Sequence, residues 1–171
     1  ILFALDDKSW RKGISIDENE GYKAQRTKSE HINWDNVFKI MNEFSDILTT
    51  NGFIVSRIKN AEADDLIALW RNEFLNRNQH VIIVSADEDV RQLVAYNATG
   101  KPALSTVFNP FTQGKNSTKK LFVPQEFHQW IKDDDNGDIF DRSIDVDKED
   151  FQRMANDAKI KVEEVDGPEI A

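Results

Sequence analysis

The pattern of apolar and polar positions predicts a chain that alternates between strands and helices. Residues 1–5 form a short apolar run that ends in two aspartates, and residues 53–58 form a second run of this kind. Residues 80–85 give the clearest strand, because their β-branched run is typical of a parallel strand buried on both faces. We therefore expect at least three short strands in the first half of the chain.

Helical periodicity separates these strands. From Asp35, one face of the predicted helix carries the apolar residues Val37, Ile40, Met41, Phe44, Ile47 and Leu48. Gly52 then stands where a C-terminal cap belongs. A second helix is predicted over residues 61–77, with an inner face of Leu66, Ile67, Trp70 and Phe74. The alternation predicts an α/β fold with a mostly parallel central sheet and helices on both faces.

The pattern changes after Tyr96. Residues 104–108 and 119–123 flank a polar stretch and predict a hairpin or paired strands, whereas residues 90–95 are expected to begin a helix. Further helices are predicted over 124–132, where proline occupies the first turn, and over 148–158. We expect a C-terminal extension that contains a hairpin and has no evident closing element.

Composition narrows the chemistry. The chain has 171 residues, 39% of them hydrophobic, which is enough for one domain with a real core. It has no cysteine, and its histidines are far apart in sequence, so a metal would be held by oxygen ligands, as Mg²⁺ or Mn²⁺ prefer. No apolar run approaches the roughly 18 residues that span a bilayer, and no signal peptide is evident.

The net charge of −9 is unevenly distributed. Residues 1–132 contain 17 acidic and 17 basic side chains, whereas residues 133–171 contain 14 acidic and 5 basic ones. The whole imbalance therefore lies in the C-terminal segment. An acidic average does not argue against nucleic-acid binding by residues 1–132.

Carboxylates follow three of the predicted strands. Asp6 and Asp7 follow the first strand, residues 62–65 follow the second, and Asp87 and Asp89 follow the third. One such cluster can be structural, since an acid in a first helical turn stabilises it by roughly 0.3–1 kcal/mol. Three clusters meeting at one sheet edge would repel one another unless cations neutralised them. Two divalent ions about 4 Å apart can clamp a scissile phosphate and activate a water.

A basic segment at residues 8–28 lies close to the first acidic pair. It interleaves cations with aromatic residues in the sequences WRK at 10–12 and YKAQR at 22–26. Lysine and arginine bind phosphates, and aromatic rings stack on unpaired bases. A solvated loop explains this segment equally well when it is taken alone.

Four motifs resemble the metal-dependent 5′-nuclease family in order and spacing: ALDDKSWRK, YKAQR, AEADDLIA and VIIVSADEDVRQL. The family includes flap endonucleases and phage 5′→3′ exonucleases of the T-even ribonuclease H type, and it has a PIN-like, resolvase-like fold. The resemblance implies hydrolysis of phosphodiester bonds by metal-activated water, with two Mg²⁺ or Mn²⁺ ions. It implies DNA with a 5′ flap, nick or duplex end, or an RNA–DNA hybrid, as substrate in replication or primer removal. It also implies the cytoplasm of a bacterium or of a phage-infected cell.

The resemblance assigns roles residue by residue. The implied metal ligands and catalytic residues are Asp6, Glu62, Asp64, Asp87 and Asp89. The implied nucleic-acid contacts are Arg11, Lys12, Tyr22, Lys23 and Arg26. Regular helix geometry would instead pair Glu62 with Asp65, which lies three positions away. Under the family assignment, Asp65 supports either the helix start or the ligands, and Asp7 and Glu88 point outward or support the ligands.

The chain also departs from the family pattern. Family members carry an upstream strand that ends in another aspartate, and a later GDxxDN motif before a helix–three-turn–helix element that binds duplex DNA. Neither is evident in the sequence. We therefore expect residues 1–132 to form a catalytic core without its first strand, and residues 133–171 to form an acidic segment that could link to a missing duplex-binding half.

Two other hypotheses remain. A catalytically incomplete relative would bind nucleic acid, or serve a structural role, without cleaving it. A phosphatase of the haloacid dehalogenase type would need a DxD pair after the first strand, and Asp6-Asp7-Lys8 does not supply one.

Overall fold

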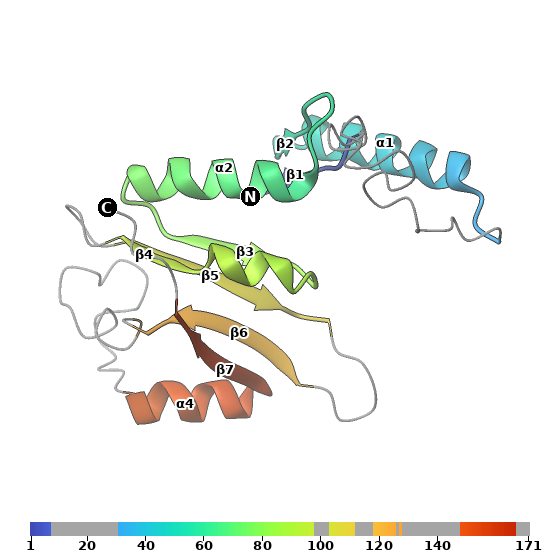
Figure 1. The fold of residues 1–171 in the computed structure, drawn as a ribbon. Helices are drawn as coiled ribbons and strands as arrows, with labels where there is room; N and C mark the ends of the chain where they lie inside the picture. The colour runs from blue at the N-terminus through green and yellow to red at the C-terminus, as the bar shows by residue number, and fades with distance from the viewer. Residues whose placement is uncertain (8–30, 98–102, 112–117, 126, 128–147, 167–171) are drawn as a thin grey trace, which may run out of the picture. The chain divides into compact units, whose positions relative to one another are not determined.

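The computed structural model of the chain describes residues 1–7, 31–97, 103–111, 118–125, 127 and 148–166. The chain divides into two compact units, Ile1–Ile67 and Ala68–Ala171. Figure 1 shows the elements in chain order. Each unit has its own sheet, and we describe the two in turn.

The first unit pairs two short strands in parallel. Strand β1 (Leu2–Ala4) lies beside β2 (Ile54–Ser56), with Leu2 opposite Ile54 and Ala4 opposite Ser56. The parallel arrangement brings the carboxyl ends of both strands to the same edge, as we expected from the acidic residues that follow them.

Helix α1 (Trp34–Thr50) belongs to the same unit and has well-defined ends. The Asn33 side chain caps its start by accepting a hydrogen bond from the Asn36 N–H at 3.1 Å. Gly52 follows its end with φ +82°, the left-handed conformation that glycine adopts without strain. The helix packs on β1, since Phe3 meets Phe44 edge-to-face with ring centroids 6.4 Å apart. The predicted helix and its glycine cap are confirmed.

Helix α2 (Ala63–Asn76) begins in the first unit and ends in the second. The predicted inner face is largely correct, because Leu66 is buried and Ile67, Trp70 and Phe74 are half-buried. Leu75, which the prediction left out, is also fully buried and clusters with Ala95 and Ala103.

The second unit contains a mixed sheet of five strands. Its strands are β3 (Val81–Val84), β4 (Ala95–Asn97), β5 (Ala103–Asn109), β6 (Lys119–Pro124) and β7 (Ile160–Val165). The order across the sheet is β3-β5-β6-β7, and β4 pairs with β5 (Figure 1). The β3/β5 and β6/β7 pairs are parallel, while β5/β6 and β4/β5 are antiparallel. The α/β class and the predicted pairing of residues 104–108 with 119–123 are confirmed.

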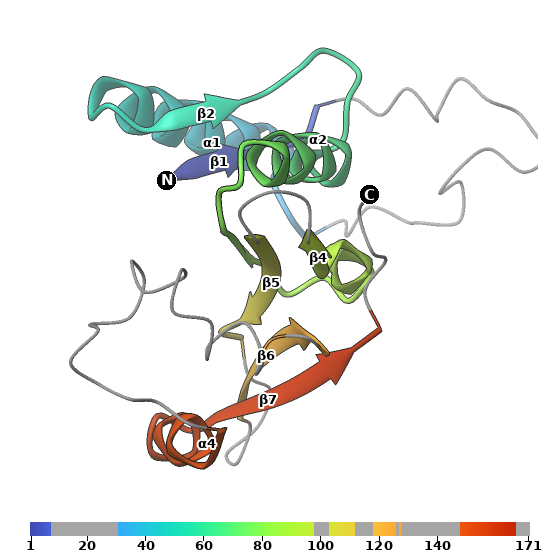
Figure 2. The same cartoon turned by 90° about the vertical axis from the view of Figure 1, so that its left-hand side faces the viewer.

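A helical element packs on each face of this sheet. Helix α4 (Lys148–Asp157) lies beside β7 (Figure 2) and places Phe151 against Phe127, with ring centroids 5.0 Å apart. The core on this face includes Leu104 and Val123. The 3₁₀ helix η2 (Asp89–Leu93) packs against β5 and places the Arg91 guanidinium 4.4 Å from the centre of the Phe122 ring.

Two sequence-based expectations were wrong in detail, and one strand was missed. The helix expected at residues 90–95 is the short η2 followed by β4. Strand β3 is not buried on both faces, because Ile82 is 69% exposed and Val84 is 62% exposed. These two share a face with the core under α4, but α4 packs at β7, on the opposite edge of the sheet from β3. Strand β7 had not been predicted at all.

Two further expectations concern the helices predicted at residues 124–132 and 148–158. The helix at 148–158 is confirmed as α4. Most of the helix expected at 124–132 lies outside the described residues. Among the helices that the structure describes, none is long and apolar enough to cross a membrane.

Candidate active site at the strand ends

Asp6 and Asp7 tie the end of β1 to the loop that precedes α2. The Asp6 carboxylate oxygen Oδ1 accepts a hydrogen bond of 2.7 Å from the Ala63 N–H, in the first turn of α2. The Asp7 oxygen Oδ2 accepts one of 3.0 Å from the Asn60 N–H, and Asp7 also lies 3.7 Å from the Arg57 guanidinium. The two aspartates therefore bind different parts of the chain: Asp6 accepts from the start of α2, and Asp7 accepts from the loop that precedes it.

The start of α2 shows how its acidic residues differ. The Asp65 oxygen Oδ2 accepts a hydrogen bond of 3.4 Å from the Glu62 N–H, as in a capping box. Glu62 immediately precedes the helix, while Asp64 lies in its first turn and is exposed. This geometry gives Asp65 the helix-start role that the family resemblance implied for it.

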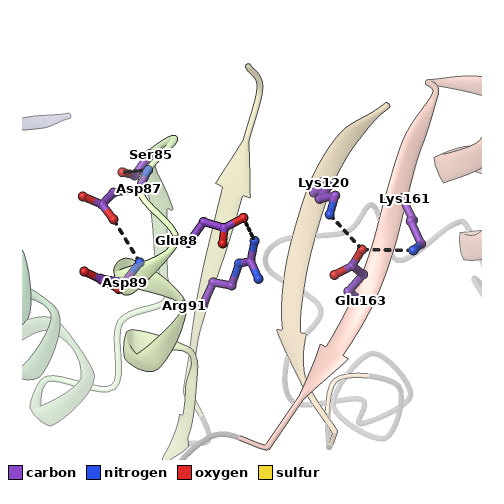
Figure 3. A network of polar contacts seen from close by, with 8 residues as sticks. All are labelled: Ser85, Asp87, Glu88, Asp89, Arg91, Lys120, Lys161 and Glu163. Carbon is purple, nitrogen blue, oxygen red and sulfur yellow. Dashed lines mark hydrogen bonds and ion pairs between the residues drawn. The ribbon is translucent and has the colours of Figure 1, made fainter. Parts of the chain in front are cut away.

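The second unit holds the remaining acidic residues just after β3. The Asp87 N–H donates to Ser85 Oγ at 3.1 Å, and Asp87 Oδ1 accepts from the Asp89 N–H at 3.0 Å (Figure 3). Both aspartates are exposed. Glu88 turns to Arg91 instead, with a distance of 2.5 Å between its Oε1 and the Arg91 Nη2. The local hydrogen bonds thus orient Asp87 while Glu88 serves an ion pair.

The structure brings some of the predicted ligands together within each unit. Asp6, Glu62 and Asp64 belong to the common carboxyl edge of β1 and β2, and Asp87 and Asp89 belong to the carboxyl end of β3. Over the described ranges, no three histidine, aspartate or glutamate side chains are grouped closely enough to hold a metal ion. The predicted nucleic-acid contacts Arg11, Lys12, Tyr22, Lys23 and Arg26 all lie outside the described residues.

Sequence reasoning missed one buried charge. Arg71 of α2 is only 7% exposed, and burial lowers the pKa of its guanidinium below the ordinary value. Its Nε has no hydrogen-bond partner in the part of the chain that the structure describes. The signal was present, because Arg71 falls four positions after Ile67 and one after Trp70, on the apolar stripe.

A lysine-rich network in the second unit was also missed. Lys120 and Lys161 both contact the Glu163 carboxylate oxygen Oε1, at 3.3 and 3.1 Å (Figure 3). The network needs strand β7, and an acidic tail offered no reason to expect a strand there.

The parallel strands that end in carboxylates, on an α/β framework, fit a resolvase-like domain. Residues 1–128 match the family model described as "5'-3' exonuclease, N-terminal resolvase-like domain". A protein named 5'-3' exonuclease from Mycoplasmopsis pulmonis (strain UAB CTIP) is 34% identical over 131 residues. The chain therefore belongs to the 5′-3′ exonuclease family.

The extent of the match sets its scope. The alignment with the Mycoplasmopsis protein covers 75% of this chain but 37% of that relative, so the chain spans little more than a third of the relative's length. No solved structure is significantly similar to the chain.

Proposed function

We propose that this chain forms the metal-binding core of a 5′-nuclease that hydrolyses phosphodiester bonds in DNA or RNA–DNA hybrids. Family membership supports nuclease chemistry. The single structural observation that carries the proposal is the 2.7 Å hydrogen bond from the Ala63 N–H to Asp6. It brings the carboxylate after β1 to the helix start that presents Glu62 and Asp64.

We assign the cation ligands to five carboxylates that lie at strand ends: Asp6, Glu62, Asp64, Asp87 and Asp89. All are oxygen donors, which fits Mg²⁺ or Mn²⁺. A pair of such ions would supply Lewis-acid activation of water and neutralise the charge on the scissile phosphate.

The chain's own hydrogen bonds prepare these ligands. The Ala63 N–H holds Asp6 through Oδ1, so we assign the ligand role to its other oxygen, Oδ2. The Asp89 N–H holds Asp87 in the same way. Fixing one oxygen of a carboxylate orients the other and lowers the entropy lost when an ion binds.

The substrate assignment follows the family. We propose DNA with a 5′ flap, a nick or a 5′ duplex end, or an RNA–DNA hybrid, cleaved to leave a 5′-phosphate during replication or primer removal. Arg11, Lys12, Tyr22, Lys23 and Arg26 are the proposed contacts to its phosphates and bases. The site of action would be the cytoplasm of a bacterium or of a phage-infected cell.

A pair of neighbouring substitutions tests the proposal. Asp87→Asn keeps an oxygen to accept from the Asp89 N–H but removes the ligand charge, whereas Glu88→Gln removes an equal charge one residue away. With a labelled 5′-flap or nicked duplex and a Mg²⁺ or Mn²⁺ titration, we expect Asp87→Asn to lose cleavage and Glu88→Gln to retain it. Failure of the unsubstituted chain to cleave with either metal would refute the proposal, as would full activity of Asp87→Asn.

One competing function belongs to the same family. A catalytically incomplete relative of this fold would bind nucleic acid, or serve a structural role, without cleaving it. Flap binding without turnover, at any metal concentration, would select this alternative.

A further inference from the structure

The sheet of the second unit carries a polar row along the edge where β3 ends. Residues paired directly across neighbouring strands point to the same face, and Asn109 pairs with Lys120, which in turn pairs with Lys161. Ser85 continues the row one position beyond β3, since its N–H donates to the Phe108 carbonyl at 3.1 Å. Figure 3 shows Lys120 and Lys161 together on this sheet.

This row begins beside a proposed metal ligand. Ser85 Oγ accepts the hydrogen bond from the Asp87 N–H. Neighbouring strands lie about 4.8 Å apart, so Lys120 is roughly 10 Å and Lys161 roughly 14 Å from Ser85 across the sheet. A nucleic-acid strand passes one phosphate per roughly 3.4 Å of helix axis, so the row spans about four phosphates.

Glu163 holds the two lysine ammonium groups at one point. Burial raises the pKa of Glu163, but hydrogen bonds from Lys161 and Lys120, with their charges, outweigh it and leave the pKa below its usual value. Glu163 therefore stays ionised and keeps both ammonium groups on one side of the sheet. Each ammonium has three donors, so one bond to Glu163 leaves two for another acceptor.

Two more lysines stand at the same edge. Lys119 begins β6 opposite Ile160, on the other face of the sheet from Lys120, and Lys159 immediately precedes β7. Lys159 has φ 56°, a left-handed conformation that glycine or asparagine usually supplies after a helix. A lysine at such a position suggests that its side chain is needed.

From these observations we infer a phosphate-binding surface, the lysine edge, formed by Lys119, Lys120, Lys159 and Lys161. Two of these lysines, Lys120 and Lys161, contact Glu163, and the four cations lie at one edge of the sheet in a chain whose net charge is −9. We propose that it binds the phosphate backbone of the nucleic-acid strand that passes Asp87, apart from the contacts proposed for residues 8–28. The inference rests on the proposed function for its substrate, but a binding measurement tests it without cleavage.

The test measures the salt dependence of binding. The full chain is titrated with a fluorescein-labelled 5′-flap DNA in EDTA, from 50 to 200 mM KCl, and anisotropy gives the slope of log K against log salt. The slope is negative, and each lost duplex phosphate contact should reduce its magnitude by about 0.9, which corresponds to about an eightfold loss of affinity at 0.1 M salt. For the double variant Lys120→Gln with Lys161→Gln, we expect the magnitude of the slope to fall by about 1.8.

Two further variants separate binding from folding. Lys159→Gly removes one charge at a position where glycine adopts the backbone conformation without strain. A smaller salt dependence of binding in this variant therefore cannot be explained by unfolding. Arg153→Gln removes a cation on α4 that is paired with Asp150, on the other face of the sheet, and should leave the slope unchanged. Thermal melts of all variants check that each is folded.

The outcomes distinguish this inference from the proposed function. Unchanged slopes in the lysine variants would overturn the lysine edge even if the chain cleaves flap DNA. Slopes of smaller magnitude in those variants would support it even if no cleavage is found. Absence of DNA binding by the unsubstituted chain would refute both. Lysine-dependent binding of a polyaspartate peptide, with no effect on DNA, would assign the surface to an acidic protein segment and overturn the inference.

Discussion

Asp6 offers a substitution pair that separates a metal-ligand role from a helix-capping role. Its Oδ1 accepts a 2.7 Å hydrogen bond from the Ala63 N–H at the start of α2. Asp6→Asn keeps an oxygen that can accept this bond but loses the negative charge. Asp6→Ala loses both the charge and the acceptor.

The structure sets the size of the two effects on stability. Loss of a capping acceptor costs about 1 kcal/mol, whereas asparagine caps nearly as well as aspartate. Loss of the charge near the helix N-terminus costs a further 0.3–1 kcal/mol, roughly. We therefore expect the free energy of unfolding to fall by about 0.5 kcal/mol in Asp6→Asn and by about 1.5 kcal/mol in Asp6→Ala.

Activity should follow a different order. If Asp6 is a ligand, both variants lose the charged oxygen, and the cleavage rate of both should fall by more than about 100-fold. Substituting a residue that only supports a metal ligand already lowers metal affinity or activity by roughly 10–100-fold. The measurements are urea unfolding and initial rates on a 5′-flap substrate over a Mg²⁺ titration. If Asp6→Asn keeps nearly full activity while Asp6→Ala loses it together with stability, Asp6 is a cap and the ligand assignment is wrong.

Three further predictions concern stability. Leu75→Ala should destabilise the chain by about 2–5 kcal/mol, because Leu75 is fully buried, whereas Leu69→Ala on the same helix, 62% exposed, should cost far less in a urea melt. Glu163→Gln should cost roughly 1 kcal/mol or less at neutral pH. The pKa of Glu163 is lowered in the folded chain, so its stabilisation is present above its unfolded pKa and is lost as pH falls through the folded pKa. The unfolding free energies of the unsubstituted chain and of Glu163→Gln should therefore converge at acid pH. A constant difference between them down to acid pH would contradict this. Gly52→Ala should cost about 1 kcal/mol through its positive φ alone, since no atom lies within 4 Å of the added Cβ, and an unaltered melting temperature would contradict that.

The strongest local patterns were the easiest to interpret. The apolar stripe after Asp35 and the glycine after it are properties of a few neighbouring residues, so helix α1 and its end followed directly. Alternation of strand and helix also predicted the α/β class and the pairing of residues 104–108 with 119–123. Residues 90–95 were misjudged because a short helical start does not reveal that the chain will join a sheet as β4.

The sequence alone determined the chemistry that is available: oxygen donors at three strand ends, no thiols, and motifs of a 5′-nuclease. It left open whether Glu62 acts with Asp64 or Asp65, because spacing on an ideal helix does not show where the helix begins. The structure decided that Asp65 accepts from the Glu62 N–H, because it shows that α2 begins at Ala63, directly after Glu62. The lysine edge likewise depended on β7 pairing with β6, a contact between residues about forty positions apart that no local pattern encodes.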